Sequence, residues 1–233
     1  GISKALDWGL DTVIAASSGN GSAATAAYAA RAGLSCMALV PEQTPTAKIL
    51  QAVMYGARII KVAGDFGNPF KFIRRLSEEF GYFNVSTSCV NPYVREGYKA
   101  ISYEICDEIG VPDWVLVPTA AGPLLGSTLQ AFSELVEAGL ANKVPRFACV
   151  QAEACAPIYK AYREKTACAV FEELRPSIAS GIIDTLDGYP QDGDFALRCI
   201  GACGGTVVAV SEEEIVDALV ALGKEGVFAE PAS

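Results

Sequence analysis

Residues 12–22 read TVIAASSGNGS, an apolar run that passes directly into a cluster of small polar residues. The run 12–16 is typical of a buried strand, and the Ala-rich stretch 21–32 predicts a helix that ends at Gly33. A buried strand, a short turn and a helix, in that order, form the unit from which parallel sheets are built. The expected fold class is therefore α/β.

The same alternation continues along the chain. Predicted strands lie at residues 12–16, 35–40, 57–62, 82–86, 114–117, 147–151 and 206–210. Predicted helices lie at 21–32, 46–55, 69–80, 95–109, 124–138 and 215–223, the last capped by Ser211 with Glu214 in the capping-box position. Because the strands are continuously apolar, we expect parallel strands buried on both faces.

A break near Asn91-Pro92 divides the sequence into two blocks. We predict two open parallel-sheet domains, residues 1–92 and 93–233. The sequence has no starting Met and stops at Ser233 with no helix after the final apolar run, so we expect it to be truncated at both ends.

Composition narrows the class of protein. Of 233 residues, 51% are hydrophobic and 19% charged, with a net charge of −9, which indicates a packed globular protein and disfavours nucleic acid or an anionic membrane as partner. No run is apolar enough for a transmembrane helix. The absence of His excludes Ser-His-Asp and Cys-His mechanisms within this chain. The eight cysteines lie mostly in apolar stretches and predict buried, reduced thiols in a cytoplasmic protein. A zinc site at Cys199 and Cys203 is the alternative, but no second ligand pair accompanies them, and no metal is expected.

Two turns between a strand and a helix are candidate sites, because ligands of parallel sheets bind beyond the carboxyl ends of the strands. The first holds Ser17, Ser18, Gly19 and Asn20, where backbone N–H groups and the helix dipole favour an anion. The second runs over residues 118–126, where N–H groups could cradle a phosphate with help from the Thr119 hydroxyl. An ordinary N-cap turn and a plain connecting loop are the alternatives.

Taken in order, the motifs resemble the pyridoxal-phosphate enzymes of the tryptophan-synthase-β fold type (fold type II), and within that group the threonine synthases. The resemblance spans essentially the whole chain. The matching pieces are SSGN (17–20), YAARAGL (28–34), YGA (55–57), NPY with EG (91–97), VPT with the Gly122 loop, VQAE (150–153), SIA (177–179) and EPAS (230–233).

The resemblance implies two α/β domains with the cofactor, pyridoxal 5′-phosphate, in a cleft between them. It implies that Asn20 bonds the pyridine 3-hydroxyl, and that Ser17, Ser18 and Gly19 bind the substrate carboxylate. Thr119, Ala120, Ala121 and Gly122 match the loop around the cofactor phosphate, although Ala120 and Ala121 replace a usual Gly and a common Ser or Asn, and Pro123 a frequent Gly. Ser233 matches a position near the pyridine nitrogen in the dehydratase branch.

The Schiff-base lysine of the family is expected upstream of Gly1, so the catalytic residue is missing from this sequence. Lys4 is the nearest alternative, but it lies in a helical pattern with Ile2 and Leu6. The expected function is a lyase of amino-acid metabolism that converts O-phospho-homoserine and water to threonine and phosphate. A serine/threonine dehydratase or another β-eliminating ammonia-lyase is the alternative, and a non-catalytic binding relative is a third. The expected partners are a small amino-acid substrate and a second copy of the chain in a homodimer.

Overall fold

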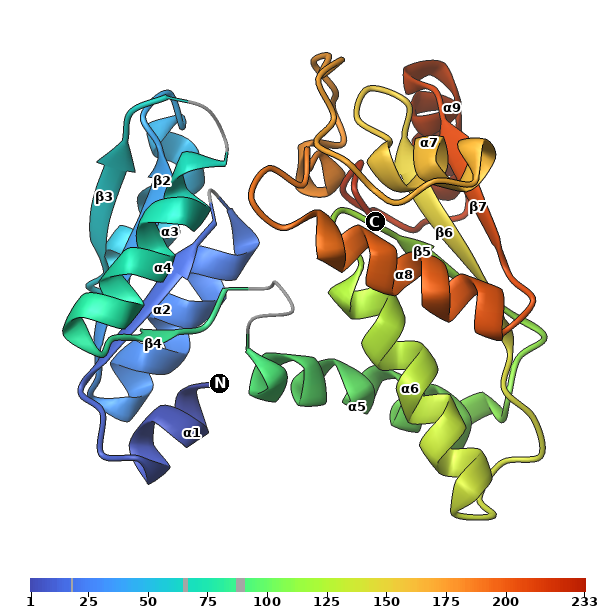
Figure 1. Ribbon diagram of the computed structural model, residues 1–233, viewed down its shortest axis with the longest axis horizontal. Coiled ribbons are helices and arrows are strands. Elements are labelled where there is room, and N and C mark those ends of the chain that lie inside the picture. Colours follow the sequence, from blue (N-terminus) through green and yellow to red (C-terminus); the bar gives the residue numbers. More distant parts are fainter. Residues whose placement is uncertain (18, 65–66, 87–90) are drawn as a thin grey trace. The chain divides into compact units, whose positions relative to one another are not determined.

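The computed structural model describes residues 1–17, 19–64, 67–86 and 91–233. The chain divides into two compact units, Gly1–Gly97 and Tyr98–Ser233. Helix α5 (Pro92–Ile109) runs through both this division and the predicted boundary at residues 92 and 93, which stays a prediction. Each unit is an α/β body of its own, as Figure 1 shows.

The first unit contains a parallel sheet of order β3-β2-β1-β4. Its strands are β1 (Thr12–Ala16), β2 (Ser35–Pro41), β3 (Arg58–Val62) and β4 (Phe83–Asn84). The chain proceeds outward from β1 to β3 and then returns to the other side of β1. The strand order therefore reverses between β1 and β4, which is the position where open parallel sheets bind ligands beyond their carboxyl ends.

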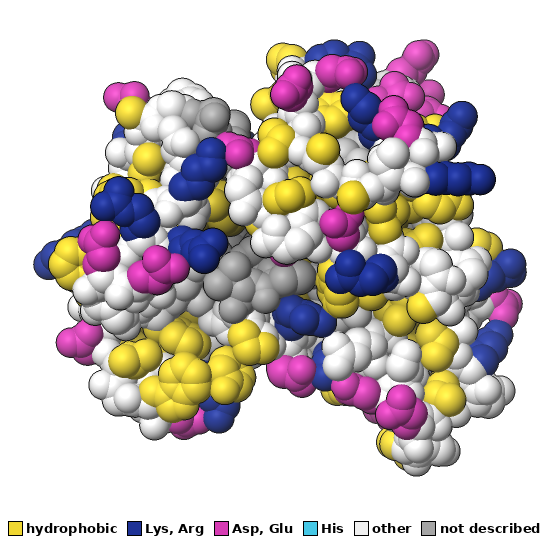
Figure 2. Space-filling view, viewed as in Figure 1, with side chains coloured by type: hydrophobic (Ala, Val, Ile, Leu, Met, Phe, Trp, Pro, Cys, Tyr) yellow, Lys and Arg dark blue, Asp and Glu magenta, His cyan; other side chains and the backbone are white. Residues whose placement is uncertain are grey.

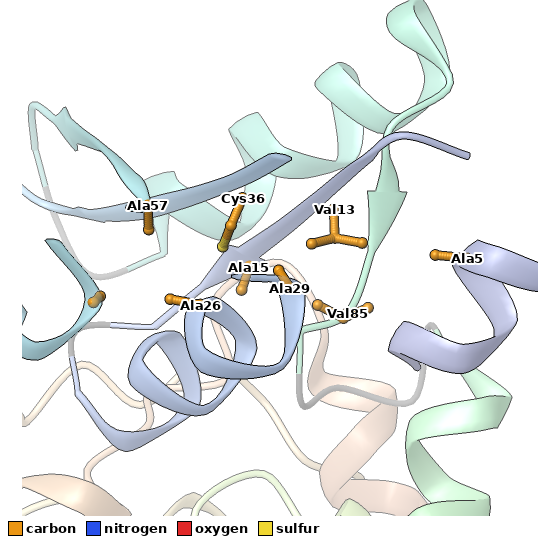
Figure 3. Close-up of a cluster of buried hydrophobic side chains, with 9 residues drawn as sticks. Ala5, Val13, Ala15, Ala26, Ala29, Cys36, Ala57 and Val85 are labelled. Atoms are coloured by element: carbon orange, nitrogen blue, oxygen red, sulfur yellow. The ribbon is translucent and has the colours of Figure 1, made fainter. Parts of the chain in front are cut away.

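Helices cover both faces of this sheet. On one face, α1 (Ile2–Asp7), α2 (Asn20–Ala32) and α3 (Thr46–Met54) contribute to a core with Val13 and Ala15. Figure 3 shows Ala26 and Ala29 of α2 turned toward that core. On the other face, α4 (Asn68–Phe80) packs Ile73 against Ile14. Successive residues of β1 thus point into two cores, as expected of a strand buried on both faces.

The second unit contains a parallel sheet of order β5-β6-β7. Its strands are β5 (Trp114–Pro118), β6 (Arg146–Ala152) and β7 (Thr206–Val210), and its helices are α6 (Pro123–Glu137), α7 (Pro157–Glu164), α8 (Pro190–Ala202) and α9 (Glu212–Lys224), with a short 3₁₀ turn η1 (Ser180–Ile182). Phe132 of α6 meets Phe147 of β6 edge to face at 6.3 Å between ring centroids. Ile215 of α9 joins Ala152 and η1 at the carboxyl end of the sheet.

One burial prediction is wrong. The apolar run 114–117 was expected to be buried on both faces, but Leu116 is 67% exposed while Val117 is 5% exposed. Strand β5 lies at an edge of the described three-stranded sheet, and its Leu116 side chain is open to solvent there. A continuous apolar run therefore does not guarantee two covered faces.

The seven predicted strands all occur, with ends that differ by a few residues. The predicted helices occur as α2, α3, α4, α5, α6 and α9, and the capping box of Ser211 and Glu214 is confirmed. Helices α7 and α8 were not predicted. Within the described ranges, none of the helices has the length and apolarity that a membrane crossing requires.

The cysteines that the structure describes are free thiols, and Cys36, Cys149, Cys155 and Cys168 are buried as expected. Burial raises the pKa of Cys149 to about 12, which makes it an inert apolar side chain at neutral pH. Cys89 lies outside the described residues. Figure 2 shows acidic and basic side chains interspersed over the visible face.

Candidate functional site

The first candidate site is the turn between β1 and α2, beside the reversal of strand order. The Ser17 N–H donates to the Leu39 carbonyl of β2 at 3.2 Å, and the Ser17 carbonyl accepts from the Ser22 hydroxyl in the first turn of α2. Gly19 is the N-cap of α2, and its N–H donates to the Ser17 hydroxyl at 3.4 Å. Ser18, the remaining residue of the predicted carboxylate site, lies outside the described residues.

Helix α2 begins at Asn20 without a side-chain cap. The N–H groups of Gly21 and Ser22 have no acceptor among the described residues, and the Asn20 side chain is exposed. Uncapped N–H groups at a helix start carry partial positive charge and favour an anion. Binding of a substrate carboxylate at this turn stays a prediction.

A second segment supports this turn from β4. The Ser86 hydroxyl accepts from the Ala16 N–H at 2.9 Å, and the Asn84 side chain accepts from the Ser86 N–H at 2.9 Å. The Asn91 side chain donates to the Asn84 carbonyl at 2.6 Å and accepts from the Tyr93 N–H at 2.9 Å, which ties the start of α5 to β4. Sequence reasoning noticed Asn91 but missed Ser86 and Asn84, because the support they give to this turn depends on the bond between Ser86 and Ala16, which are far apart along the chain.

The second candidate site is the loop from Thr119 to Gly122, between β5 and α6. Helix α6 has Gly122 as its N-cap, no side-chain cap and Pro123 as its first residue. In the described structure the N–H groups of Ala120, Ala121 and Gly122 have no acceptor. A row of unpaired N–H groups before a helix of this length is suited to a phosphate.

The glycines of this loop are explained by helix α8. Gly122 has φ +110°, and a Cβ there would lie 2.6 Å from the Cβ of Ala196. A Cβ on Gly126 would lie 2.1 Å from the Phe195 ring. Gly122 therefore needs the absence of a side chain, and a side chain at Gly126 would require the Phe195 ring to move.

The Thr119 side chain has a partner inside the protein. Its hydroxyl donates to the Val117 carbonyl at 2.7 Å, and the residue is 2% exposed. Since a hydroxyl has one proton, the side chain as placed here has none left for a phosphate. The backbone of the loop, rather than the Thr119 hydroxyl, offers the donors.

Ser233 ends a turn in which its N–H donates to the Glu230 carbonyl at 3.0 Å. Its neighbour Ala232 packs on η1, where a Cβ on Gly181 would be 2.8 Å away. No hydrogen bond in the described part of the chain joins Ser233 to the Thr119–Gly122 stretch. Its predicted role near the pyridine nitrogen stays a prediction.

A buried acid in the second unit was missed by sequence reasoning. Burial raises the pKa of Asp184 to about 6, although the Leu186 N–H and the Tyr189 hydroxyl both donate to its carboxylate. Burial and the neighbouring Asp184 charge in turn raise the pKa of Tyr189 well above its usual range. No pattern in residues 183–189 announces this pair. Across the described residues, no cluster of three or more acidic or cysteine side chains could hold a metal ion.

The fold and these two loops define an α/β protein in which a helix without a side-chain cap begins at the carboxyl end of each sheet. The three N–H groups before α6 that have no described acceptor are donors with partial positive charge, and a phosphate ester offers negatively charged acceptor oxygens. The residues present therefore fit a phosphorylated cofactor. The sequence model described as "Pyridoxal-phosphate dependent enzyme" matches residues 2–233, and the chain belongs to this family. Pyridoxal phosphate is the cofactor of the family.

Curated relatives are similar in sequence to this chain over its full length. Threonine synthase of Methanocaldococcus jannaschii is 35% identical over 237 residues, covering all of this chain and 57% of the relative. Threonine synthase of Halalkalibacterium halodurans is 37% identical over 235 residues, covering all of this chain and 62% of the relative. The chain therefore spans about three fifths of the length of these relatives.

Solved structures confirm the fold. Maize serine racemase superposes with a TM-score of 0.78 at 21% identity, over 94% of this chain and 63% of that protein. The threonine deaminase of T.th. superposes with a TM-score of 0.76 at 24% identity, over 99% of this chain and 72% of that protein. The predicted fold type is confirmed.

Proposed function

We propose that this chain is the core of a pyridoxal-phosphate-dependent lyase of the threonine synthase type, which converts O-phospho-homoserine and water to threonine and phosphate. The observation that carries the proposal is the agreement with threonine synthases over all of this chain at about 35% identity. The likeness to deaminases and racemases, at 24% identity or less, concerns the fold alone.

In this proposal the first loop binds the amino-acid substrate. Ser17, Ser18 and Gly19 hold the substrate carboxylate at the start of α2, where the helix dipole favours negative charge. Gly19 supports this role because a Cβ there would meet no described heavy atom within 4 Å, so the fold itself leaves room for a ligand. Asn20 is exposed at the start of α2, and in this proposal its carboxamide bonds the cofactor 3-hydroxyl.

The second loop holds the cofactor phosphate. The N–H groups of Ala120, Ala121 and Gly122 donate to its oxygens, and the start of α6 adds the favourable end of its dipole. Bound pyridoxal phosphate supplies an electron sink for negative charge at the substrate α-carbon. Anchoring the carboxylate and the phosphate orients the α C–H bond for cleavage. A lysine upstream of Gly1 is proposed to hold the cofactor and to accept the proton.

The test is a product analysis with the complete gene product and added pyridoxal phosphate. O-phospho-L-homoserine should give threonine and inorganic phosphate in equal amounts. Ammonia and a keto acid from threonine or serine, without phosphate release, would support the dehydratase alternative and reject the proposal. No absorbance near 410–430 nm with added cofactor would instead favour the non-catalytic relative, since a cofactor held by a lysine absorbs there.

Two further expectations belong to the same proposal. Residues 1–233 alone should show no turnover, because the lysine is expected upstream of Gly1. The complete protein should elute as a homodimer on size exclusion. Turnover by the isolated chain would place the lysine within it, with Lys4 the first residue to replace.

A further inference from the structure

Gln151 lies at the carboxyl end of β6 and is fully buried. Its carboxamide nitrogen donates to the carbonyls of Thr119 and Ala120 at 3.4 and 3.2 Å. Its carboxamide oxygen accepts from the N–H groups of Ile158 and Tyr159 at 2.9 and 3.0 Å. Two carbonyls on one side and two N–H groups on the other fix which end of the amide is which, and every hydrogen-bonding position of the side chain is used.

These bonds determine where the second loop directs its donors. In a trans peptide the C=O of one residue and the N–H of the next point in opposite directions, and no described peptide bond is cis. When Gln151 binds the Thr119 carbonyl, the Ala120 N–H must point away from Gln151. The bond to the Ala120 carbonyl turns the Ala121 N–H away in the same manner. The Gln151 side chain of β6 therefore sets the direction of the Ala120 and Ala121 N–H groups, which have no described acceptor.

The other half of the amide fixes Gln151 itself. Helix α7 begins after Ala156, which has no side chain able to cap it. The Gln151 oxygen fills that role by accepting the first available N–H groups of α7. The loop, the strand and α7 are thereby connected through one carboxamide.

We propose that Gln151 is a positioning residue for the anion-binding loop, holding the Ala120 and Ala121 N–H groups toward the cofactor phosphate while it caps α7. This inference rests on the proposed function, because it assumes that the Thr119–Gly122 stretch binds the phosphate. It assigns Gln151 no contact with the cofactor.

The discriminating variant is Gln151→Glu in the complete gene product. A carboxylate keeps both acceptor contacts to α7 but has no proton to donate to the two carbonyls. Protonation of this buried carboxyl at lower pH restores one donor. Gln130→Glu is the matched control, because it makes the same change of charge in α6 at a side chain that bonds Glu134, in the same helix.

The measured quantity is the ratio of two dissociation constants, the Kd of pyridoxal phosphate divided by the Kd of pyridoxal, which lacks the phosphate. The ratio is determined between pH 6 and pH 8 and is compared with that of wild type at the same pH. At pH 8, Gln151→Glu should raise this ratio about tenfold or more. That is the effect expected when the loop N–H groups lose a hydrogen bond to the charged phosphate. The ratio should return toward wild type at pH 6. Gln130→Glu should remain near wild type throughout.

Two outcomes reject the proposal in different ways. An unchanged ratio in Gln151→Glu, whether both Kd values stay the same or both rise equally, would limit Gln151 to a structural role. A wild-type protein that binds pyridoxal as tightly as pyridoxal phosphate would reject the phosphate loop itself, and with it this part of the proposed function.

A measurement on wild type covers the case in which the variant does not fold. Hydrogen exchange of the Ala120 and Ala121 amides should slow by about tenfold or more with pyridoxal phosphate but not with pyridoxal, because a bound acceptor protects an N–H. Unchanged exchange at both amides would show that these N–H groups do not face the ligand.

Discussion

Gly122→Ala is expected to destabilise the protein through two separable effects. The first is backbone strain, because φ is +110° at Gly122, and a left-handed conformation costs a residue with a Cβ about 1–2 kcal/mol. The second is overpacking, because the new Cβ would lie 2.6 Å from the Ala196 Cβ and 3.2 Å from the Asp192 carbonyl oxygen, at a cost of about 1–3 kcal/mol. Together they lower the free energy of unfolding by about 2–5 kcal/mol.

Urea unfolding of four variants separates the two effects. Gly139→Ala, at the other end of α6, has φ +72° and open space around the new Cβ, so it should cost about 1 kcal/mol from strain alone. Ala196→Gly is made alone and combined with Gly122→Ala, and the double variant should recover the overpacking part, seen as a favourable coupling of about 1 kcal/mol or more in the double-mutant cycle. If Gly122→Ala costs no more than Gly139→Ala, or the cycle shows no coupling, the packing of α6 on α8 is not as described.

Three further predictions concern other parts of the chain. Ser211→Ala removes the side chain that accepts from the Glu214 N–H at 3.2 Å, so urea unfolding should show a loss of about 1 kcal/mol, whereas an unchanged midpoint would mean that the capping box does not stabilise α9. Asp184 has a pKa raised from its ordinary 3.8 to about 6 by burial, so the folded state binds this proton more tightly and stability should fall as pH rises from about 4 to 6; Asp184→Asn should flatten that part of the urea-midpoint profile, and an equal slope in both proteins would contradict the assignment. Gly19→Ala should leave the unfolding free energy within about 1 kcal/mol of wild type, because its Cβ meets open space, but it should raise the KM for the amino-acid substrate; an unchanged KM would remove Gly19 from the carboxylate site.

The parts of the fold that the sequence predicted are those with local causes. Strand β1 has the same ends in prediction and structure, and the capping box of Ser211 was visible because both partners lie within one turn. Helix α7 was missed because its N-terminal acceptor is Gln151 of β6, not a neighbour along the chain. Helix α8 was missed because Gly193 weakens its pattern, and that glycine is explained only by Cys168 and Leu186 packed against it.

In the candidate site, too, the sequence predicted the features with local causes and missed those that depend on distant residues. The positions of the two turns followed from strand-helix order and from resemblance, and the structure places N–H groups without described acceptors in both. In the Thr119–Gly122 loop the direction of those groups did not follow, because the carbonyls of this loop bond to Gln151 of another strand. The inward hydrogen bond of the Thr119 hydroxyl was likewise invisible without the Val117 carbonyl.

Three glycines of the two loops differ in whether the packing of the fold explains the absence of a side chain. Gly122 and Gly126 sit against Ala196 and Phe195, so the packing of α8 explains them whether or not a phosphate binds. Gly19 meets no described neighbour within 4 Å. The packing of the described chain therefore does not account for this glycine. Of the three, Gly19 is therefore the position at which substitution tests binding rather than folding.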